Sequence, residues 1–418
     1  MKKHLLALSA AAVLLAPNAV GAEGFSINEW SAEGFGMAGA RMFAENDAAN
    51  MAYNPASLTK IQGEKAKVSL AYISPHGKYK AEGSKATQAG YNGEPDGQGW
   101  IYSGHNRVNP AYAPGMYYVK QINDKEWLGL GTYARFGNMC QFERDSIVGS
   151  NAFSSRMNGV SLGLNYARKH DSKWSTSVGA EINYVGLQLD KNLNRVMPLH
   201  VEGTSWALGW NAAANYAFDD KNEFGVVYRS KVKHSMEAEY DVHGMIEDAG
   251  DAYGCVTLPE NWMLGYGHKF NDKTRMELNA TWTRWSRFDA FNMALTGGQF
   301  AALNNGALNS PKNWKDGWRY AIGVEHKLSD KYTLLAGMAH DERGIPDETA
   351  DFMVPTGERD TYTLGVQYHD KKQTIAASFG YMDVGDVNMK WHKGSAYANA
   401  KMHDSYTKIV VLSYQYNF

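Results

Sequence analysis

Arg135 and Arg229 are the residues whose chemistry can be inferred most directly from their surroundings. Both lie in segments where apolar residues alternate with small or polar ones, and both fall on the small, polar face. A guanidinium can bind a carboxylate through two parallel hydrogen bonds. We therefore expect one or both arginines to bind the acidic head of a ligand whose tail lies against apolar walls. The alternative is that they pair with internal carboxylates such as Glu181 or Glu325.

Catalytic and metal chemistry find little support in the sequence. His340-Asp341-Glu342 is the best local candidate for acid–base catalysis, which needs a nucleophile or an activated water held by a histidine and a carboxylate. No serine or second carboxylate is tied to this triplet, so a histidine at a membrane interface is the simpler interpretation. Cys140 and Cys255 belong to no Cys/His cluster with zinc-like spacing. We expect no enzyme activity, no metal and no cofactor.

The N-terminus indicates the compartment. A basic start, an apolar run over residues 5–15 and small residues at Val20 and Ala22 predict a secretory signal peptide over residues 1–22. After it no stretch of about 18 apolar residues occurs, which excludes helical membrane spans. The net charge is −2 and no block of basic residues is present, so we expect no nucleic-acid partner.

Period-two alternation recurs along the remaining chain and predicts strands. In residues 205–218 one face is rich in tryptophan and leucine, and the other is mostly small and polar, as expected of a wall between lipid and a wet lumen. Alternating aromatics at Tyr414, Tyr416 and Phe418 are typical of a closing strand. The predicted strands number about fourteen, which fits the even count of bacterial barrels; they cover residues 65–74, 114–122, 127–137, 158–168, 174–188, 204–218, 223–234, 261–270, 274–288, 317–328, 332–343, 361–369, 374–382 and 406–418.

The connections between these strands are of two kinds. Short polar turns, such as Asn123-Asp124-Lys125 and Asn271-Asp272-Lys273, recur about every 40 to 60 residues and alternate with long irregular stretches. We predict an all-β, 14-stranded antiparallel transmembrane β-barrel over residues 65–418, a multi-pass protein of the bacterial outer membrane. The short turns are expected on the periplasmic side. Residues 191–203, 243–259 and 294–315 are expected among the extracellular loops.

The two cysteines are expected on the extracellular side of this barrel. Cys140 follows the third predicted strand and Cys255 follows the seventh. An exported chain meets an oxidising compartment, so a disulfide between them is permitted. Sequence alone leaves the pairing open, because it does not give the distance between the two residues.

Residues 23–64 do not fit the strand pattern. They are rich in glycine and alanine, and Asn54 reads as a helix N-cap with Pro55 at the first helical position. A barrel of about fourteen strands encloses a lumen too wide for wall side chains to fill. We predict that this segment is a small helical hatch that plugs the lumen. The alternative is a periplasmic extension outside the barrel.

Five segments carry recognisable motifs: the mature start Gly24–Ser31, the triplet Asn54-Pro55-Ala56 and three later segments, Leu258–Glu260, Trp282–Ser286 and Trp314–Tyr320. They resemble the motifs of the FadL/TodX family of outer-membrane transporters of hydrophobic compounds. The resemblance implies a 14-stranded barrel with an N-terminal hatch and an internal hydrophobic site. It also implies a kink in the third strand, near Phe136–Met139, that opens a route sideways through the wall. Gly137 could adopt the angles that break a strand ladder; a plain bulge is the alternative.

The function implied by this resemblance is passive transport of hydrophobic small molecules, above all long-chain fatty acids. The alternatives are an aromatic hydrocarbon channel, a general porin and a barrel lipase. We expect Phe25, Ile27 and Trp30 to contact the ligand, with packing inside the hatch as the alternative. Asn54, Pro55, Ala56 and Gly137 are expected to gate passage. The further expected partners are outer-membrane lipid, lipopolysaccharide and the barrel assembly machinery, and the expected state is a monomer.

Overall fold

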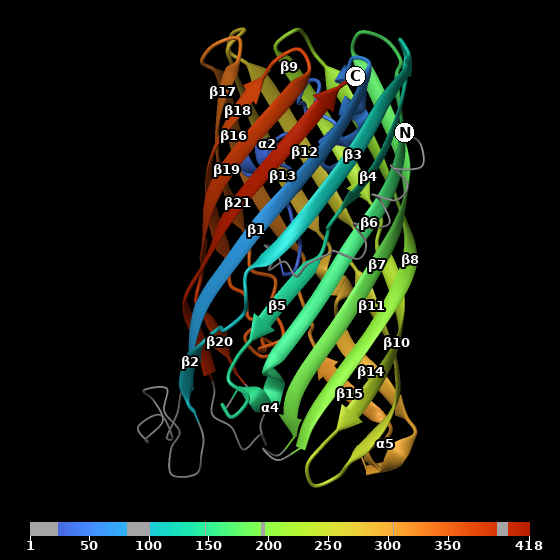
Figure 1. Cartoon of the computed structure of the whole chain (residues 1–418), viewed down its shortest axis with the longest axis vertical. Helices are drawn as coiled ribbons and strands as arrows, with labels where there is room; N and C mark the ends of the chain where they lie inside the picture. The colour runs from blue at the N-terminus through green and yellow to red at the C-terminus, as the bar shows by residue number, and fades with distance from the viewer. Residues whose placement is uncertain (1–23, 82–100, 147, 194–196, 304, 391–399) are drawn as a thin grey trace.

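The wall of the protein is one antiparallel sheet that closes on itself. The computed structural model describes residues 24–81, 101–146, 148–193, 197–303, 305–390 and 400–418. Strand β1 (Glu64–Ala81) pairs with β21 (Ala400–Asn417) along its whole length and so closes the cylinder (Figure 1). Consecutive pieces such as β4 and β5 belong to one wall strand, so fourteen strands surround the lumen.

The remaining strands follow in chain order. They are β2 (Ser103–His105), β3 (Ala111–Asn123), β4 (Glu126–Tyr133), β5 (Gly137–Gln141), β6 (Ser154–Lys169), β7 (Trp174–Leu193), β8 (Met197–Ala217), β9 (Asn222–Arg229), β10 (Val232–Val242), β11 (Asp248–Leu258), β12 (Asn261–Lys269), β13 (Thr274–Thr283), β14 (Ala290–Thr296), β15 (Ala307–Pro311), β16 (Gly317–Lys327), β17 (Tyr332–Asp341), β18 (Arg359–His369), β19 (Gln373–Val384) and β20 (Val387–Met389). The short helices are α2 (Ala32–Gly36), α3 (Asn50–Tyr53), η1 (Pro55–Lys60), α4 (Gly149–Ala152), η2 (Trp285–Arg287) and α5 (Gly298–Leu303).

Side chains alternate between the two faces of the wall as predicted. On β8, Trp206, Leu208 and Trp210 are 59%, 77% and 53% exposed on the outside, whereas Asn211 and Asn215 face the lumen and are buried. An apolar residue on this outer face costs nothing in lipid, and a polar one is tolerated inside. The predicted fourteen-stranded barrel is thereby confirmed. The short turns lie at the top in Figure 1 and mark the periplasmic end.

Part of what we expected to be extracellular loop is wall. Residues 243–259 and 294–315 contain β11, the end of β14 and β15. Residues 191–193 belong to β7, and residues 197–203 belong to β8. Strand β11 pairs with β10 over its whole length, yet its sequence is rich in Gly and Asp, which rarely favour strands. The loop prediction was wrong here because tertiary pairing overrides local propensity. The barrel therefore extends well beyond the membrane on the extracellular side.

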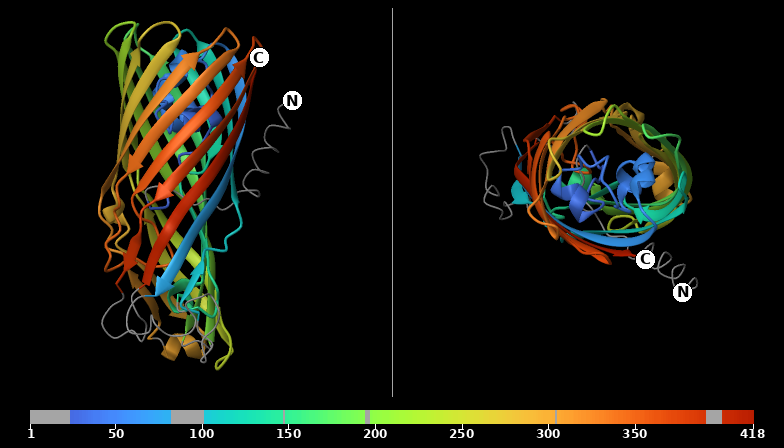
Figure 2. Two further views of the ribbon diagram at one scale, coloured as in Figure 1. Left: turned by 90° about the vertical axis from the view of Figure 1, so that its left-hand side faces the viewer. Right: turned by 90° about the horizontal axis from the view of Figure 1, so that it is seen from above.

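The N-terminal segment lies inside the barrel. Residues 24–63 carry α2, α3 and η1 and fill the lumen, as the view from above in Figure 2 shows. Their backbone bonds to the last wall strand: the Ala32 amide donates to Ser413 Oγ at 2.7 Å, and the Ala48 amide donates to Gln415 Oε1 at 2.9 Å. The plug is confirmed, and a periplasmic extension outside the barrel is wrong. The signal peptide predicted for residues 1–22 lies outside the described residues.

The two cysteines remain separate thiols. Cys140 in β5 is buried, Cys255 in β11 is exposed, and both are free. Both strands lie in the half of the barrel away from the short turns, the lower half in Figure 1. The disulfide that the sequence permitted is not formed.

Candidate functional site

The third wall strand is interrupted where the hatch touches it. Strand β4 ends at Tyr133 and β5 begins at Gly137. The hatch supplies the missing partners, because the Ile27 amide donates to Arg135 O at 2.9 Å and the Gly137 amide donates to Phe25 O at 2.8 Å. An isolated antiparallel bridge joins Ser26 to Phe136. The start of the hatch thus acts as a short strand that replaces neighbours which the wall does not provide.

Beside this break the wall lacks the backbone hydrogen bonds that would join β3 to the third wall strand. Strand β3 pairs with β4 only from Met116 to Asn123, whereas its residues 111–115 pair with β1 alone. The break lies at residues 134–136 and overlaps the predicted position, Phe136–Met139, at Phe136. Gly137 has no positive φ, so its conformational freedom is not what breaks the strand. Gly159 of β6 matters more, since a Cβ there would lie 2.5 Å from Phe136 O. A glycine opposite the predicted kink was the signal that sequence reasoning missed.

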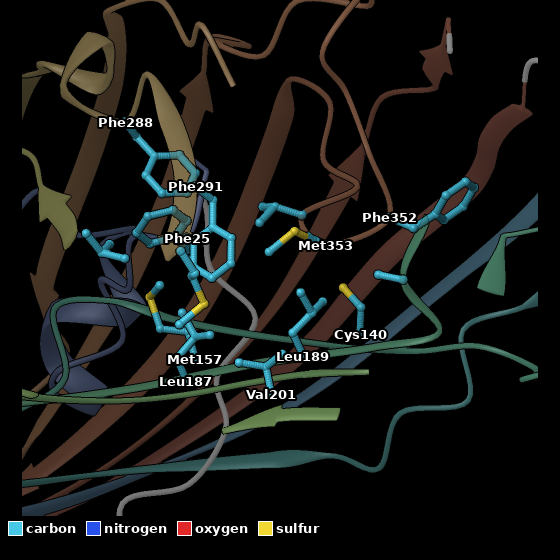
Figure 3. Packing of buried hydrophobic residues seen from close by; sticks show 14 of the residues in the cluster. Phe25, Cys140, Met157, Leu187, Leu189, Val201, Phe288, Phe291, Phe352 and Met353 are labelled. Atoms are coloured by element: carbon cyan, nitrogen blue, oxygen red, sulfur yellow. The ribbon is translucent and has the colours of Figure 1, made fainter. Parts of the chain in front are cut away.

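Next to the break, inside the extracellular half of the lumen, lies an apolar cluster, which we call the outer cluster. At its centre is Phe25, whose ring is 4.8 Å from Trp285, 5.3 Å from Phe288, 5.6 Å from Trp314 and 5.9 Å from Phe136. Strands and loops from all around the barrel add further apolar side chains, including Met157, Leu187, Leu189, Val201, Phe291 and Met353 (Figure 3). The cluster is a continuous hydrophobic surface in the middle of a barrel.

The three predicted ligand contacts lie in different places. Phe25 is in the outer cluster, whereas Ile27 packs in a separate cluster against residues of β1, β3, β19 and β21. The ring of Trp30 lies 5.0 Å from that of Tyr53 in a tilted arrangement, and its Nε1 donates to Ala134 O at 2.5 Å. The surroundings of Trp30 therefore match the alternative of packing within the hatch. Only Phe25 reaches the large hydrophobic surface.

The two predicted arginines share one carboxylate. Arg135 Nη1 lies 3.0 Å from Glu181 Oε2, and Arg229 Nη1 bonds to Glu181 Oε1. Tyr133 and Asn211 donate to the same Glu181 oxygen at 2.9 and 3.0 Å. The pairing with Glu181 is thus the alternative that the sequence left open, while Glu325 pairs with Arg41 and Arg275. Two cations face one anion, all are buried, and among the described residues Arg135 Nη2 has no hydrogen-bond partner.

The predicted gating triplet joins the hatch to the wall. Asn54 Oδ1 accepts the Ala56 amide at 3.1 Å and caps η1, with Pro55 as its first residue, as predicted. Asn54 Nδ2 also donates to Asn215 Oδ1 of β8 at 2.7 Å. Ala56 is fully buried, and its carbonyl accepts from Ser175 of β7. The triplet therefore fixes one side of the hatch to the barrel.

The periplasmic side of the hatch is held by a buried network of ion pairs, which we call the polar floor. Lys67 of β1 lies 2.7 Å from Glu33 and 2.7 Å from Asp47, both in the hatch. Arg41 in turn pairs with Asp47 at 3.4 Å and with Glu325 of β16 at 2.6 Å. Burial alone would raise the pKa of Asp47, but Lys67 and Arg41 outweigh it and hold the pKa below its usual value. A polar cavity of about 660 Å³ adjoins this network.

The remaining sequence candidates lie away from these features. His340 is on the outer face of β17 and pairs with Asp360 at 2.8 Å, whereas the next residue, Asp341, faces the lumen and pairs with Arg319. The triplet is therefore split between two faces. Among the described residues no group of three or more His, Cys, Asp or Glu side chains could hold a metal. The helices described are all too short or too polar to cross a membrane.

Comparison with known proteins places these features in context. The model of the outer membrane protein transport family, OMPP1/FadL/TodX, matches residues 13–418. The long-chain fatty acid transport protein of Escherichia coli K12 is 23% identical over 426 residues, which cover 90% of this chain and 91% of that protein. Outer membrane protein P1 of Haemophilus influenzae Rd is 25% identical over 433 residues, which cover 93% and 92%.

Solved structures share the fold. A Pseudomonas aeruginosa FadL homologue superposes with a TM-score of 0.83 at 20% identity, over 94% of this chain and all of the other. The Pseudomonas putida toluene transporter TodX superposes with a TM-score of 0.71 at 17% identity, again over 94% of this chain and all of the other.

Proposed function

Because the chain belongs to the OMPP1/FadL/TodX family of outer membrane transport proteins, we propose that it carries hydrophobic small molecules, chiefly long-chain fatty acids, into the cell. The observation that carries the proposal is the outer cluster. A water-filled pore needs no hydrophobic surface at its centre, whereas a passage for apolar cargo does. The cargo then exchanges one apolar environment for another and avoids an aqueous crossing.

The hatch start is the gate in this proposal. Phe25 occupies the centre of the outer cluster, and the backbone of Phe25 to Ile27 seals the break in the third strand. A ligand that displaces Phe25 also strains these backbone bonds. When the segment withdraws from residues 134–137, the wall beside β3 loses its seal and the cargo leaves sideways into lipid. Asn54, Pro55 and Ala56 keep the rest of the hatch in place during this movement.

The surplus positive charge of Arg135 and Arg229, on the periplasmic side of the outer cluster, favours an acidic head group. Arg135 and Arg229 together carry one more charge than Glu181 neutralises, and Arg135 Nη2 has no partner among the described residues. A fatty-acid carboxylate that accepts from this nitrogen would complete the network. The tail would then lie among Phe25 and the walls of the outer cluster. This role for the arginines combines the two arrangements that the sequence left open.

A second cargo class is aromatic hydrocarbon. The solved TodX structure is described as a toluene transporter, and the ring-rich surroundings of Phe25 would suit such a cargo. A general porin fits less well, because the hatch packs across the lumen. An enzyme also fits less well, because His340 and Asp341 lie on opposite faces. We further propose that the protein is inserted by the barrel assembly machinery and acts as a monomer in contact with lipid and lipopolysaccharide.

The decisive experiment compares an acid with its uncharged analogue. Arg135→Ala with Arg229→Ala should weaken binding of oleate to the purified protein and spare oleyl alcohol. Equal oleate affinity in wild type and double variant would exclude the head-group site and favour an uncharged hydrocarbon cargo. Binding of neither compound by the wild-type protein, combined with no uptake of labelled oleate by cells that express it, would overturn the transport function itself.

The gate has a separate test. Replacing Asn54 and Pro55 with alanine should impair oleate uptake at equal surface levels, while heat-modifiable migration shows that the barrel still assembles. Unchanged uptake would remove the triplet from the gating mechanism.

A further inference from the structure

The outer surface of the barrel carries a row of aromatic side chains that the transport path does not use. Register partners on four neighbouring strands, β9, β12, β13 and β16, form it: Tyr228, Trp262, Trp282 and Trp318. On β8 the ring of Trp210 extends the row, 4.9 Å from Tyr228. Trp210 and Trp262 are 53% and 44% exposed. The row faces lipid and not the lumen.

The height of this row can be placed relative to the membrane. On β12, Trp262 lies eight residues from Phe270, which stands at the short turn. Eight residues of a strand tilted by about 40° rise roughly 20 Å along the barrel axis. Outer-membrane barrels carry an apolar band of about 25 Å between two aromatic girdles. The row therefore marks the extracellular boundary of the membrane, at the head groups of the outer leaflet.

Positive charge is concentrated just beyond the row. The Glu260 side chain is more than nine-tenths buried and lies 3.2 Å from Arg284 and 3.0 Å from Arg287. Both arginines remain partly exposed, so their other N–H groups are open to a further acceptor. Lys231 is exposed and lies between the pairs Arg229–Asn261 and Val232–Leu258, a register that sets it opposite Pro259, the residue before Glu260. One buried carboxylate thus orients two guanidiniums, and Asp316 also acts electrostatically on Arg287, so what the site offers a ligand is the outward N–H groups of Arg284 and Arg287.

An open groove on the outer face of the wall begins at these charged residues and runs toward the periplasmic end. It has a volume of about 650 Å³. Small side chains, Ala212, Ala214 and Val226, form its floor. Three tryptophans of the row, Trp210, Trp262 and Trp282, form its walls, while Glu260 and Arg284 stand at one end. A groove of this shape on a lipid-facing wall holds an apolar chain, because water is excluded there. Charge at one end and an apolar trough behind it match the two parts of a lipid.

We propose that this groove binds one lipopolysaccharide molecule of the outer leaflet, with a lipid A phosphate on Arg284 and Arg287 and an acyl chain between the tryptophans. Arginine suits this role because its planar fork matches phosphate oxygens and its charge does not titrate. Glu260 holds both guanidinium groups in position before the lipid binds. The site does not depend on the identity of the cargo, since it lies on the opposite face of the wall.

The test measures lipid retention by native mass spectrometry of the purified, folded barrel. The probe is diphosphorylated lipid A, with its fully dephosphorylated form as the second ligand. Wild type should retain one diphosphorylated molecule and lose most of that occupancy, about tenfold, with the dephosphorylated form. Arg284→Gln with Arg287→Gln should cause a similar loss. Equal occupancy in wild type and this double variant, or equal binding of both lipids by the wild type, would overturn the proposal.

Two further variants make the result specific to the groove. Arg168→Gln removes a comparable exposed arginine, paired with Glu126 at 3.8 Å, at the opposite end of the barrel, and should leave lipid A retention unchanged. Ala212→Phe fills the groove without altering any charge and should reduce retention of the diphosphorylated lipid. A loss with Arg168→Gln equal to that of the double variant would show that general charge, and not this site, binds the lipid. Heat-modifiable migration confirms that each variant is folded.

Discussion

The two halves of the lumen hold the hatch by opposite means. In the extracellular half Phe25 is held by aromatic rings and by backbone bonds to a broken strand. In the periplasmic half Lys67 and Arg41 tie the hatch to the wall through buried carboxylates. Apolar packing can be exchanged for packing on a ligand, whereas a buried charge that loses its partner is strongly penalised. We infer that the hatch has a fixed end on the periplasmic side, held by ion pairs, and an exchangeable end on the extracellular side, whose apolar packing a ligand can replace.

The largest effect is expected when the ion pairs that hold the fixed end of the hatch are broken. Lys67→Met leaves Glu33 buried without its cation and Asp47 with Arg41 as its remaining partner. Breaking a buried pair in this way costs about 3–5 kcal/mol. The hatch should loosen, which single-channel conductance would detect as larger openings. Lys65→Met is the matched control, since Lys65 lies on the same face two residues away and, within the described part of the chain, its ammonium bonds to Asn417 and not to a carboxylate. Equal conductance in the two variants would contradict the role of the floor.

A pair of phenylalanines tests the exchangeable end against the fixed end. Phe25 and Phe43 are both about 1% exposed, one in the outer cluster and one in the floor region. Removing a buried phenyl ring costs about 3 kcal/mol or more. Phe25→Ala should open protease cleavage only ahead of Ser31 and leave conductance low, whereas Phe43→Ala should raise conductance. The same pattern in both variants would mean that the hatch moves as one body.

Gly159→Ala perturbs the seal without touching the hatch. The new Cβ would meet Phe136 O at 2.5 Å, so the strand break must shift, at a cost of about 1–3 kcal/mol. Oleate uptake should change while conductance stays low. Gly163→Ala is the control on the same strand, because its Cβ would meet nothing closer than 3.4 Å. An unchanged uptake rate in Gly159→Ala would argue against passage beside this break.

The smallest expected effect is on pH dependence, which should have opposite signs at the two ends. The pKa of Asp47 is lowered, so its contribution is complete above the unfolded value of about 3.9 and is lost as pH falls through the folded pKa. The pKa of Glu29 in the hatch start is raised, mainly by burial, so docking of that segment should strengthen as pH falls through the folded value. A tenfold change in a proton-binding constant corresponds to only about 1.4 kcal/mol, which is why this effect ranks last.

Amide hydrogen exchange measured between pH 3 and 8 distinguishes the two ends of the hatch. Protection near Phe25 should rise on mild acidification, and protection near Asp47 should fall only below about pH 4. Glu29→Gln should abolish the first change and keep the second. A rise near Phe25 that persists in Glu29→Gln would assign it to another group.

Two kinds of sequence signal predicted parts of the site: the period-two alternation of strands and the N-cap of a helix. The lumen face of Arg135 and Arg229 follows from alternation, and the role of Asn54 follows from the Asn-Pro pair. The shared partner Glu181 does not follow, because it depends on which strands neighbour each other. Lys67 was visible as an inward lysine on β1, yet its partners come from a segment without periodicity. For the same reason Phe25, Ile27 and Trp30 could not be separated by sequence.

The contacts between the hatch and the final strand have a consequence for how the protein is made. Ala32 and Ala48 bond to Ser413 and Gln415 across more than 360 residues. Strand β21 is also the strand that completes the cylinder against β1. These contacts have very high contact order, so they form late and slowly. We expect the hatch to be folded inside the curved sheet before the seam closes. The same groups that block the lumen then serve as the template on which the last strand finds its register.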